Sequence, residues 1–331
     1  MTLLRKILMA APQIEKQIHK LMRNWSNEKL DQSKIKEEWI KEFLTHCEDS
    51  LRKQLKPRDD EYYHRASSMG RPLCVLQNQK KKSPKSEKDY NFIMKMLIGD
   101  LTEGVVSLMA KMAGVKIVAE GTETELVIGG AKIVGTDDHT IETPAGKKVY
   151  DTKTTSSFQW RDKWSKGYEA LKDNDSFGYI PQLYIYALGQ GIDVGGWIVV
   201  NKETGELKVV EVADSKEEKE RVIQEIQNKV KAIDEDWSFR KCFKPQDDYF
   251  NKKYTDSKYL GVECSFCDFR GTCWPHAKRL PRAKSNAKSA TYRWYTRYMG
   301  KELNEDTKRK GQGPKAATMG AKQTSRKVSS A

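Results

Sequence analysis

The sequence predicts an α/β fold in which a mixed central β-sheet is flanked by helices. One observation is a helix-forming stretch from about residue 91 to 113, which Gly114 ends. A second is a series of segments rich in strand-forming residues and separated by turn residues. These strands are expected near residues 115–120, 124–129, 131–141 and 147–154. The third is a hairpin expected at 195–212, followed by a helix at 215–236.

Residues 1–60 are expected to form a helical N-terminal extension. Apolar residues recur at helical spacing in two runs, which are Ile14, Ile18, Leu21 and Trp25, and then Ile35, Trp39 and Phe43. This periodicity is typical of amphipathic helices. We expect both helices to cover the core rather than to bind a partner.

The chain shows no sign of membrane insertion or secretion. The apolar stretch from Leu3 to Ala11 is short and is interrupted by Arg5 and Lys6, unlike a signal peptide. No run approaches the roughly 18 apolar residues of a membrane span. We therefore expect a soluble protein that is located in the cytoplasm of a bacterium or of a phage-infected host cell.

Positive charge is concentrated at the C-terminal end. The chain has 331 residues and a net charge of +14, and residues 277–331 contain fifteen Lys and Arg but only three Asp and Glu. Residues 281–331 are expected to be a basic and largely disordered tail. Such a tail could tether nucleic acid, direct localisation or favour solubility, and a nearby nuclease site would favour the tether. Aromatic and arginine residues between 292 and 298 could stack on bases or form a helix packed on the core.

Two aspartates are expected to face each other across a hairpin. If the turn closes with Pro144 and Ala145 at its tip, opposed residues have numbers that sum to 289, and Asp138 then lies opposite Asp151. Facing carboxylates repel each other unless a cation or a proton lies between them. Because side chains alternate along a strand, Asp151 and Lys153 share one face.

These residue types suit a divalent metal beside a phosphodiester. Mg²⁺ and Mn²⁺ prefer oxygen ligands, and such ions can polarise a phosphate oxygen and activate water. A lysine in the same place can neutralise charge that builds on the phosphate. Glu103, in the helix expected at 91–113, adds a third carboxylate.

The ordered set of motifs resembles the PD-(D/E)XK nuclease superfamily, and within it the RecB-like branch. The matching residues are Gly99 and Glu103, then Gly135 and Asp138 of G-x-x-D, then Asp151 and Lys153 of D-x-K, then Gln182 and Tyr186 of Q-x-x-x-Y. The resemblance implies a restriction-endonuclease-like core, expected at residues 61–280. It also implies that Glu103, Asp138 and Asp151 bind the metal and that all three act in catalysis with Lys153. Gln182 and Tyr186, four apart on one helix face, would contact nucleic acid. Asp137 is a rival for Asp138, but it lies outside G-x-x-D and on the other strand face.

Three of the six cysteines form a C-x2-C-x5-C group, Cys264, Cys267 and Cys273. Thiolates this close normally share a metal, and the tight spacing argues against disulfides. In one interpretation His276 completes a Cys3His zinc site. In the other a distant cysteine joins the three to hold a 4Fe–4S cluster.

The resemblance favours the iron–sulfur cluster. AddB-type and CRISPR-adaptation nucleases place one cysteine before the nuclease core and a C-x2-C-x5-C group after it. Cys74 is in the matching place here, and Cys47 is the fallback. Cys242, like Cys47, is expected to be an ordinary buried cysteine. The cluster would act as a structural clasp joining two distant parts of the chain.

The function implied is that of a Mg²⁺- or Mn²⁺-dependent deoxyribonuclease. By the resemblance it would be an exonuclease on single-stranded DNA or duplex ends, acting in replication, recombination or processing, and a phage-type stand-alone member. It could also form a homo-oligomer or bind a recombination partner. Two alternatives stay open: a non-catalytic nucleic-acid-binding protein on a nuclease scaffold, and a nuclease subunit of a larger DNA-processing complex.

Overall fold

The computed structural model describes residues 12–56 and 61–303. The chain divides into two compact units. Of the described residues, the first unit contains those up to Lys244 and, after an interruption, Val262–Cys273. The second contains Pro245–Gly261 and the described residues from Trp274 to Leu303. The core expected at 61–280 is therefore interrupted, because residues 245–261 and 274–280 belong to the second unit.

A mixed five-stranded sheet forms the centre of the first unit, as the sequence predicts. Its strand order is β2 (Ile117–Glu120), β5 (His139–Thr143), β6 (Gly146–Thr155), β7 (Asp193–Asn201) and β8 (Leu207–Glu211). The β6–β7 pair is parallel, and the other neighbouring pairs are antiparallel. The α/β class with mixed sheets is confirmed.

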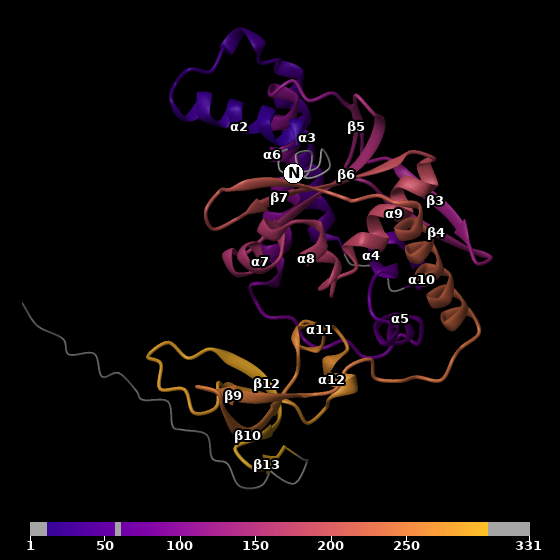
Figure 1. The fold of residues 1–331 in the computed structure, drawn as a ribbon, viewed down its shortest axis with the longest axis vertical. Coiled ribbons are helices and arrows are strands. Elements are labelled where there is room, and N and C mark those ends of the chain that lie inside the picture. The colour runs from indigo at the N-terminus through magenta and orange to yellow at the C-terminus, as the bar shows by residue number, and fades with distance from the viewer. Residues whose placement is uncertain (1–11, 57–60, 304–331) are drawn as a thin grey trace, which may run out of the picture. The chain divides into compact units, whose positions relative to one another are not determined.

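A smaller sheet lies in the same unit, with strand order β1 (His64–Arg65), β4 (Ala131–Thr136) and β3 (Glu123–Ile128). The single strand expected at 131–141 is thus two strands, β4 and β5, which belong to different sheets. The chain passes from one sheet to the other at Asp137 and Asp138 (Figure 1).

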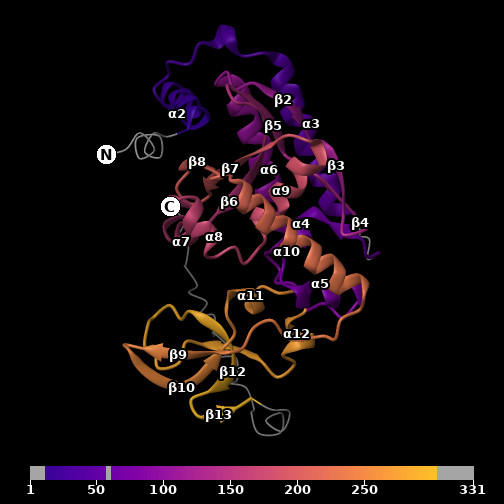
Figure 2. The same cartoon turned by 45° about the vertical axis from the view of Figure 1, so that its right-hand side comes forward.

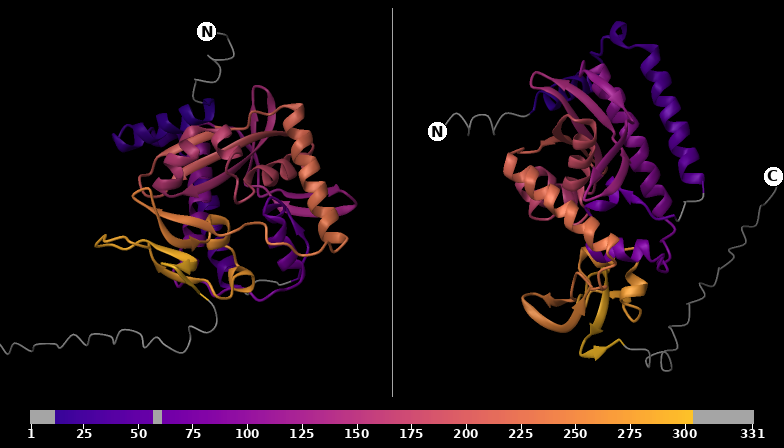
Figure 3. Two further views of the ribbon diagram at one scale, coloured as in Figure 1. Left: turned by 60° about the horizontal axis from the view of Figure 1, so that its bottom comes forward. Right: turned by 90° about the vertical axis from the view of Figure 1, so that its right-hand side faces the viewer.

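Helices cover both faces of the central sheet. The long ones are α2 (Gln13–Ser26), α3 (Glu37–Leu55), α6 (Phe92–Met112), α9 (Tyr179–Gln190) and α10 (Lys216–Asp234). Helix α3 runs beside α6, and α10 beside α9 (Figures 2 and 3). Short helices are α4 (Ala66–Met69), α5 (Leu73–Lys80), α7 (Ser157–Asp162), α8 (Tyr168–Lys172), α11 (Val262–Ser265) and α12 (Arg270–Cys273), with 3-10 turns at Gln32–Lys34 and Trp164–Lys166. No described helix is both long enough and apolar enough to cross a membrane.

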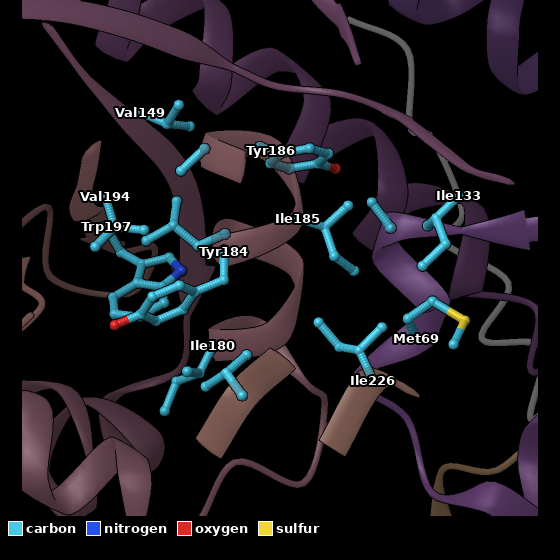
Figure 4. Close-up of a cluster of buried hydrophobic side chains, with 14 of the residues drawn as sticks. Met69, Ile133, Val149, Ile180, Tyr184, Ile185, Tyr186, Val194, Trp197 and Ile226 are labelled. Atoms are coloured by element: carbon cyan, nitrogen blue, oxygen red, sulfur yellow. The ribbon is translucent and has the colours of Figure 1, made fainter. Parts of the chain in front are cut away.

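Alternating residues of β6 and β7 build two cores on opposite faces of the sheet. Val149 and Trp197 pack with α9 and α10 in one cluster, part of which is shown in Figure 4. Tyr150 and Ile198 pack with α2 and α6 in the other. Helix α2 contributes Ile14 and Ile18 to this second core, so the first N-terminal helix covers the core as expected.

The second unit is a five-stranded sheet with strand order β11 (Lys278–Pro281), β12 (Tyr292–Tyr298), β10 (Lys253–Tyr259) and β9 (Gln246–Phe250), with β13 (Lys301–Glu302) paired to β12. Its small core contains Ala283, Tyr295 and Leu303. Residues 281–303 are therefore not a disordered tail, and residues 292–298 form a strand rather than a helix. The physical reason is that β12 is rich in aromatic residues and has pairing partners on both sides. The rest of the expected tail, 304–331, lies outside the described residues.

Candidate active site

The hairpin register brings Asp138 and Asp151 together as the sequence predicts. His139 pairs with Tyr150 and Thr143 with Gly146, so opposed residues sum to 289. Asp138 lies one residue before the paired segment, and its Oδ2 accepts a hydrogen bond from the backbone N–H of Thr152 at 2.6 Å. The carboxylate of Asp138 is thereby fixed beside the strand that carries Asp151 and Lys153.

The neighbouring Asp137 has a different role from Asp138. Its side chain is buried, Oδ1 accepts a hydrogen bond from the backbone N–H of Thr122 at 2.7 Å, and Oδ2 accepts from Thr140 and Gln190 at 3.0 Å each. These bonds fasten the crossing point between the two sheets. Asp137 is therefore a structural residue, and Asp138 is the one available to a ligand.

Asp151 is the most deeply buried of the three candidate carboxylates Glu103, Asp138 and Asp151, with 1% of its surface exposed. Burial, together with the nearby Asp138 charge and against the opposing effect of Lys153, raises the pKa of Asp151 to about 7. Burial also raises the pKa of Asp138 and of Glu103. The charge of Glu103 also contributes to the raised pKa of Asp138, and the charge of Asp151 contributes to the raised pKa of Glu103. The three carboxylates therefore lie in one region.

Lys153 supplies a cation to this acidic region. Its Nζ forms an ion pair with Asp151 Oδ2 and lies 5.4 Å from the ring centroid of Tyr179. Burial opposes the charged form, but Asp151 and then Asp138 outweigh it and raise the pKa of Lys153. The lysine is therefore charged at neutral pH. It contacts Asp151, a carboxylate whose charged form is disfavoured by burial.

His139 is a second basic group here, and sequence reasoning missed it. It is buried beside Asp138, and its Nε2 lies 3.0 Å from Thr152 Oγ1. Burial lowers the pKa of His139, but Glu120, 3.6 Å away, and the nearby carboxylates outweigh this and raise it. The signal available in the sequence was the position of this histidine directly after the G-x-x-D motif.

Gln182 and Tyr186 lie on one face of α9, as expected from their spacing. Gln182 Nε2 donates to the Tyr186 hydroxyl at 2.9 Å. Tyr186 is 3% exposed, and Asp151 and Asp138 are among the groups that act on its pKa, which burial raises. The tyrosine therefore forms a wall of the acidic region.

The glycine of G-x-x-D has a packing role. A Cβ atom on Gly135 would lie 2.7 Å from both Ala66 Cβ and Tyr186 Cε1. By contrast, a Cβ on Gly99 in α6 would meet only Thr154 Oγ1 at 3.9 Å. Of the two motif glycines, Gly99 and Gly135, only Gly135 is required by close approach of its neighbours.

We expect Gly135→Ala to destabilise the protein by about 1–3 kcal/mol, because the added methyl overpacks the contact with Tyr186. The matched variant Gly99→Ala is expected to be neutral or to stabilise by up to about 1 kcal/mol, because alanine favours a helix interior. Denaturant unfolding of both variants measures this. Equal stability of the two would contradict the packing role.

The donor chemistry fits a hard divalent cation, although the site is not preassembled. Asp151 Oδ2 is buried and, apart from the ion pair with Lys153, has no hydrogen-bond partner. Carboxylate oxygens of this kind are the ligands that Mg²⁺ and Mn²⁺ prefer. Within the described ranges, no three His, Cys, Asp or Glu side chains form a group that could hold a metal ion. A cation would therefore have to draw Glu103, Asp138 and Asp151 closer together.

In metal-free protein, Asp151→Asn is expected to flatten the dependence of stability on pH between about pH 4 and 7. The folded-state pKa of about 7 lies above the usual 3.8, so the folded state holds a proton on Asp151 between about pH 4 and 7 that the unfolded state releases. Stability therefore falls as pH rises through that range. An uncharged amide does not titrate, so this fall, at least about 1 kcal/mol in the chelator-treated native chain, should be largely absent from Asp151→Asn. The variant also leaves the Lys153 ammonium without its partner, which lowers stability at every pH in this range.

The control for this measurement is Asp137→Asn, between β4 and β5, which loses hydrogen bonds but keeps the Asp151 carboxyl. It should lower the melting temperature at every pH. If stability falls between pH 4 and 7 by the same amount in Asp151→Asn as in the native chain, Asp151 is not the group that titrates there.

Candidate thiol cluster

Cysteines distant in the sequence meet in the first unit. The backbone N–H of Cys74, in α5, lies 3.2 Å from Cys242 Sγ. The charge of Cys267 contributes to the raised pKa of Cys74, and the charge of Cys273 contributes to the raised pKa of Cys267. Asn78 Nδ2 donates a hydrogen bond to Cys273 Sγ at 3.8 Å. Cys74 and the C-x2-C-x5-C group therefore belong to one region, as the resemblance implies.

Cys242 is not the ordinary buried cysteine that the sequence predicted. It is exposed, and the Cys74 contacts lower its pKa to about 6 despite desolvation. Cys47 is half-buried in α3, and His276 belongs to the second unit. The only sequence signal for Cys242 was its spacing of 22 residues before Cys264, which is too wide to indicate a shared site.

A polar segment between α5 and α6 fastens the Cys-rich segment. Ser86 donates its backbone N–H to Asp268 O at 2.5 Å and accepts at Oγ from the Gly271 N–H at 2.9 Å. Thr272 Oγ1 donates to Pro84 O at 2.8 Å, and Lys88 pairs with Asp268. These contacts hold the Cys-rich segment against the residues that follow α5. In the described part of the chain, no three of the cysteine side chains form a group that could already hold a metal ion.

Comparison with known proteins

Comparisons with protein-family models and with curated proteins give no match. Among solved structures, the chain is similar to the crystal structure of SSO0001 with a TM-score of 0.39 and 16% sequence identity. The match covers 71% of this chain and 95% of the other.

Proposed function

We propose that this protein is a metal-dependent DNA nuclease of the PD-(D/E)XK type with exonuclease action. The observation that carries the proposal is the buried pair Asp151 and Lys153 on β6, with Asp138 fixed across the hairpin and Glu103 in the same acidic region. A buried cluster of carboxylates that resists ionisation is costly for a fold. Groups whose pKa values are strongly shifted by burial and by a specific charged partner are concentrated at functional sites, which supports the proposal.

Each residue has a role in the proposed reaction. Glu103, Asp138 and Asp151 would hold Mg²⁺ or Mn²⁺, which supplies Lewis-acid stabilisation and lowers the pKa of water. Lys153, already charged, would bind the scissile phosphate oxygen and offset the negative charge that grows during attack. The wall formed by Tyr186 and Gln182 would limit water and orient the strand.

We further propose that Cys74, Cys264, Cys267 and Cys273 hold a 4Fe–4S cluster, for which sulfur donors are suited. The support is the proximity of Cys74 to Cys267 and of Cys267 to Cys273. A cluster there would join α5 to the Cys-rich segment and would act in stability rather than in hydrolysis.

The experiment that tests the function uses end-labelled linear and closed-circular single-stranded DNA with anaerobically purified protein and Mg²⁺ or Mn²⁺. An exonuclease digests only the linear form, and an endonuclease digests both. Tight binding without cleavage of either form would favour the non-catalytic nucleic-acid-binding alternative, or a missing partner.

A further inference from the structure

The second unit is strongly basic in its described part. Residues Pro245–Gly261 and Trp274–Leu303 contain eleven Lys and Arg against four Asp and Glu. All four acidic residues are already ion-paired within the unit, as Asp248 with Arg293, Asp247 with Lys258, and Asp256 and Glu302 with Arg297. Positive charge therefore dominates this small sheet.

One face of the sheet is used for its own core. Asp248 is fully buried and accepts hydrogen bonds from the Tyr295 hydroxyl at 2.7 Å and from Arg293 at 2.6 Å. Side chains alternate along strands, so Tyr249, next to Asp248, points to the opposite face. Tyr292, three residues from the buried Tyr295, does so as well.

Three tyrosines on strands leave large parts of their rings in solvent. Tyr249 is 51% exposed, Tyr254 40% and Tyr292 55%. Tyr249 and Tyr254 are directly opposed across β9 and β10, with ring centroids 5.7 Å apart. The guanidinium of Arg279 lies 5.7 Å from the Tyr292 ring centroid. Aromatic rings beside cations are the elements of a surface on which bases stack while phosphates are neutralised.

We propose that this exposed face, the tyrosine face defined by Tyr249, Tyr254 and Tyr292, binds single-stranded DNA independently of the metal. This proposal rests on the proposed nuclease function and deepens it. It assigns binding of the DNA strand to the second unit, and hydrolysis to the acidic region of the first unit. The exposed rings favour a nucleic acid over an acidic peptide, since a peptide would need the charges alone.

The test measures the affinity of the full-length chain for fluorescent oligothymidine by anisotropy, with chelator present so that no cleavage occurs. Tyr249→Ala/Tyr254→Ala is expected to weaken binding at least about ten-fold, because stacking on both rings is lost. Tyr249→Phe/Tyr254→Phe keeps the rings and should bind within about three-fold of the native chain. Tyr90→Ala, which removes a 95% exposed ring from the first unit, should have no effect.

Salt dependence gives a second readout. Arg279→Ala, which removes the guanidinium beside the Tyr292 ring, should reduce the slope of log affinity against log salt by about 0.7, the value for one phosphate contact on a single strand. Unchanged affinity in the alanine pair, with a native circular dichroism spectrum, would overturn the tyrosine face. Equal competition by polyglutamate would also overturn it, in favour of an acidic protein partner. If native protein digests DNA while the alanine pair binds normally, the nuclease proposal stands and only the tyrosine face is lost.

Discussion

Lys153→Ala is expected to reduce the rate of DNA hydrolysis by about 10²–10³-fold, the usual cost of removing one preorganised charge-stabilising donor. Lys153 is held charged by Asp151 and lies on the same strand face. It is therefore in place before substrate arrives, and its loss should lower the turnover rate more than substrate affinity. The measurement is single-turnover digestion of end-labelled linear single-stranded DNA with Mn²⁺, with binding followed separately in chelator.

The matched control is Lys147→Ala near the start of the same strand, β6, where the side chain is exposed. This variant should cleave at the native rate. If Lys153→Ala cleaves as fast as Lys147→Ala, the lysine has no part in the reaction. If the two variants and the native chain all bind DNA but none of them cleaves it, the alternative of a non-catalytic nucleic-acid-binding protein gains support.

Loss of the proposed cluster is expected to have the largest effect on stability. Cys267→Ser should give colourless protein that unfolds at a much lower temperature, because metal binding free energy becomes folding free energy when the ligands lie far apart in sequence. The free energy of unfolding of a native protein is only about 5–15 kcal/mol, so a domain that loses several kcal/mol of it unfolds when warmed. Iron, sulfide and zinc analysis of anaerobically purified protein, with thermal unfolding, measures both effects.

Cys242→Ser is the control that the structure adds. If Cys74 is the fourth ligand, Cys74→Ser loses iron and Cys242→Ser retains it, although the two cysteines are in contact. The reverse result would make Cys242 the ligand. Zinc in place of iron and sulfide would contradict the cluster. Native-like stability in Cys267→Ser would mean that no structural metal group is held there.

The sequence by itself predicted the elements and contacts that depend on local order. The helix expected at 91–113 is Phe92–Met112, the strand at 147–154 is Gly146–Thr155, and the helix at 215–236 is Lys216–Asp234. The register opposite Asp151 could be predicted because a two-residue turn fixes every later pair by simple counting.

Only the tertiary structure decided which polar side chains form hydrogen bonds within the protein and are therefore not available to a ligand. Nothing in Asp137-Asp138 shows that the first is tied to Thr122, Thr140 and Gln190. Those partners lie up to 53 residues away, and they become neighbours only because the chain changes sheets at this point. The same applies to Cys242, whose Sγ accepts from the backbone N–H of Cys74, 168 residues distant in sequence.

The C-terminal region shows the same limit from the opposite side. Its high content of Lys, Arg and Ser indicated a tail, because composition measures how little apolar surface a segment can bury by itself. Residues 292–298 fold as a central strand because β10, from before the Cys-rich segment, and β11 supply hydrogen-bond partners on both sides. Periodicity and turn residues act over a few positions and can be read from the chain. Strand pairing across an insertion depends on where the chain returns, which only the folded molecule determines.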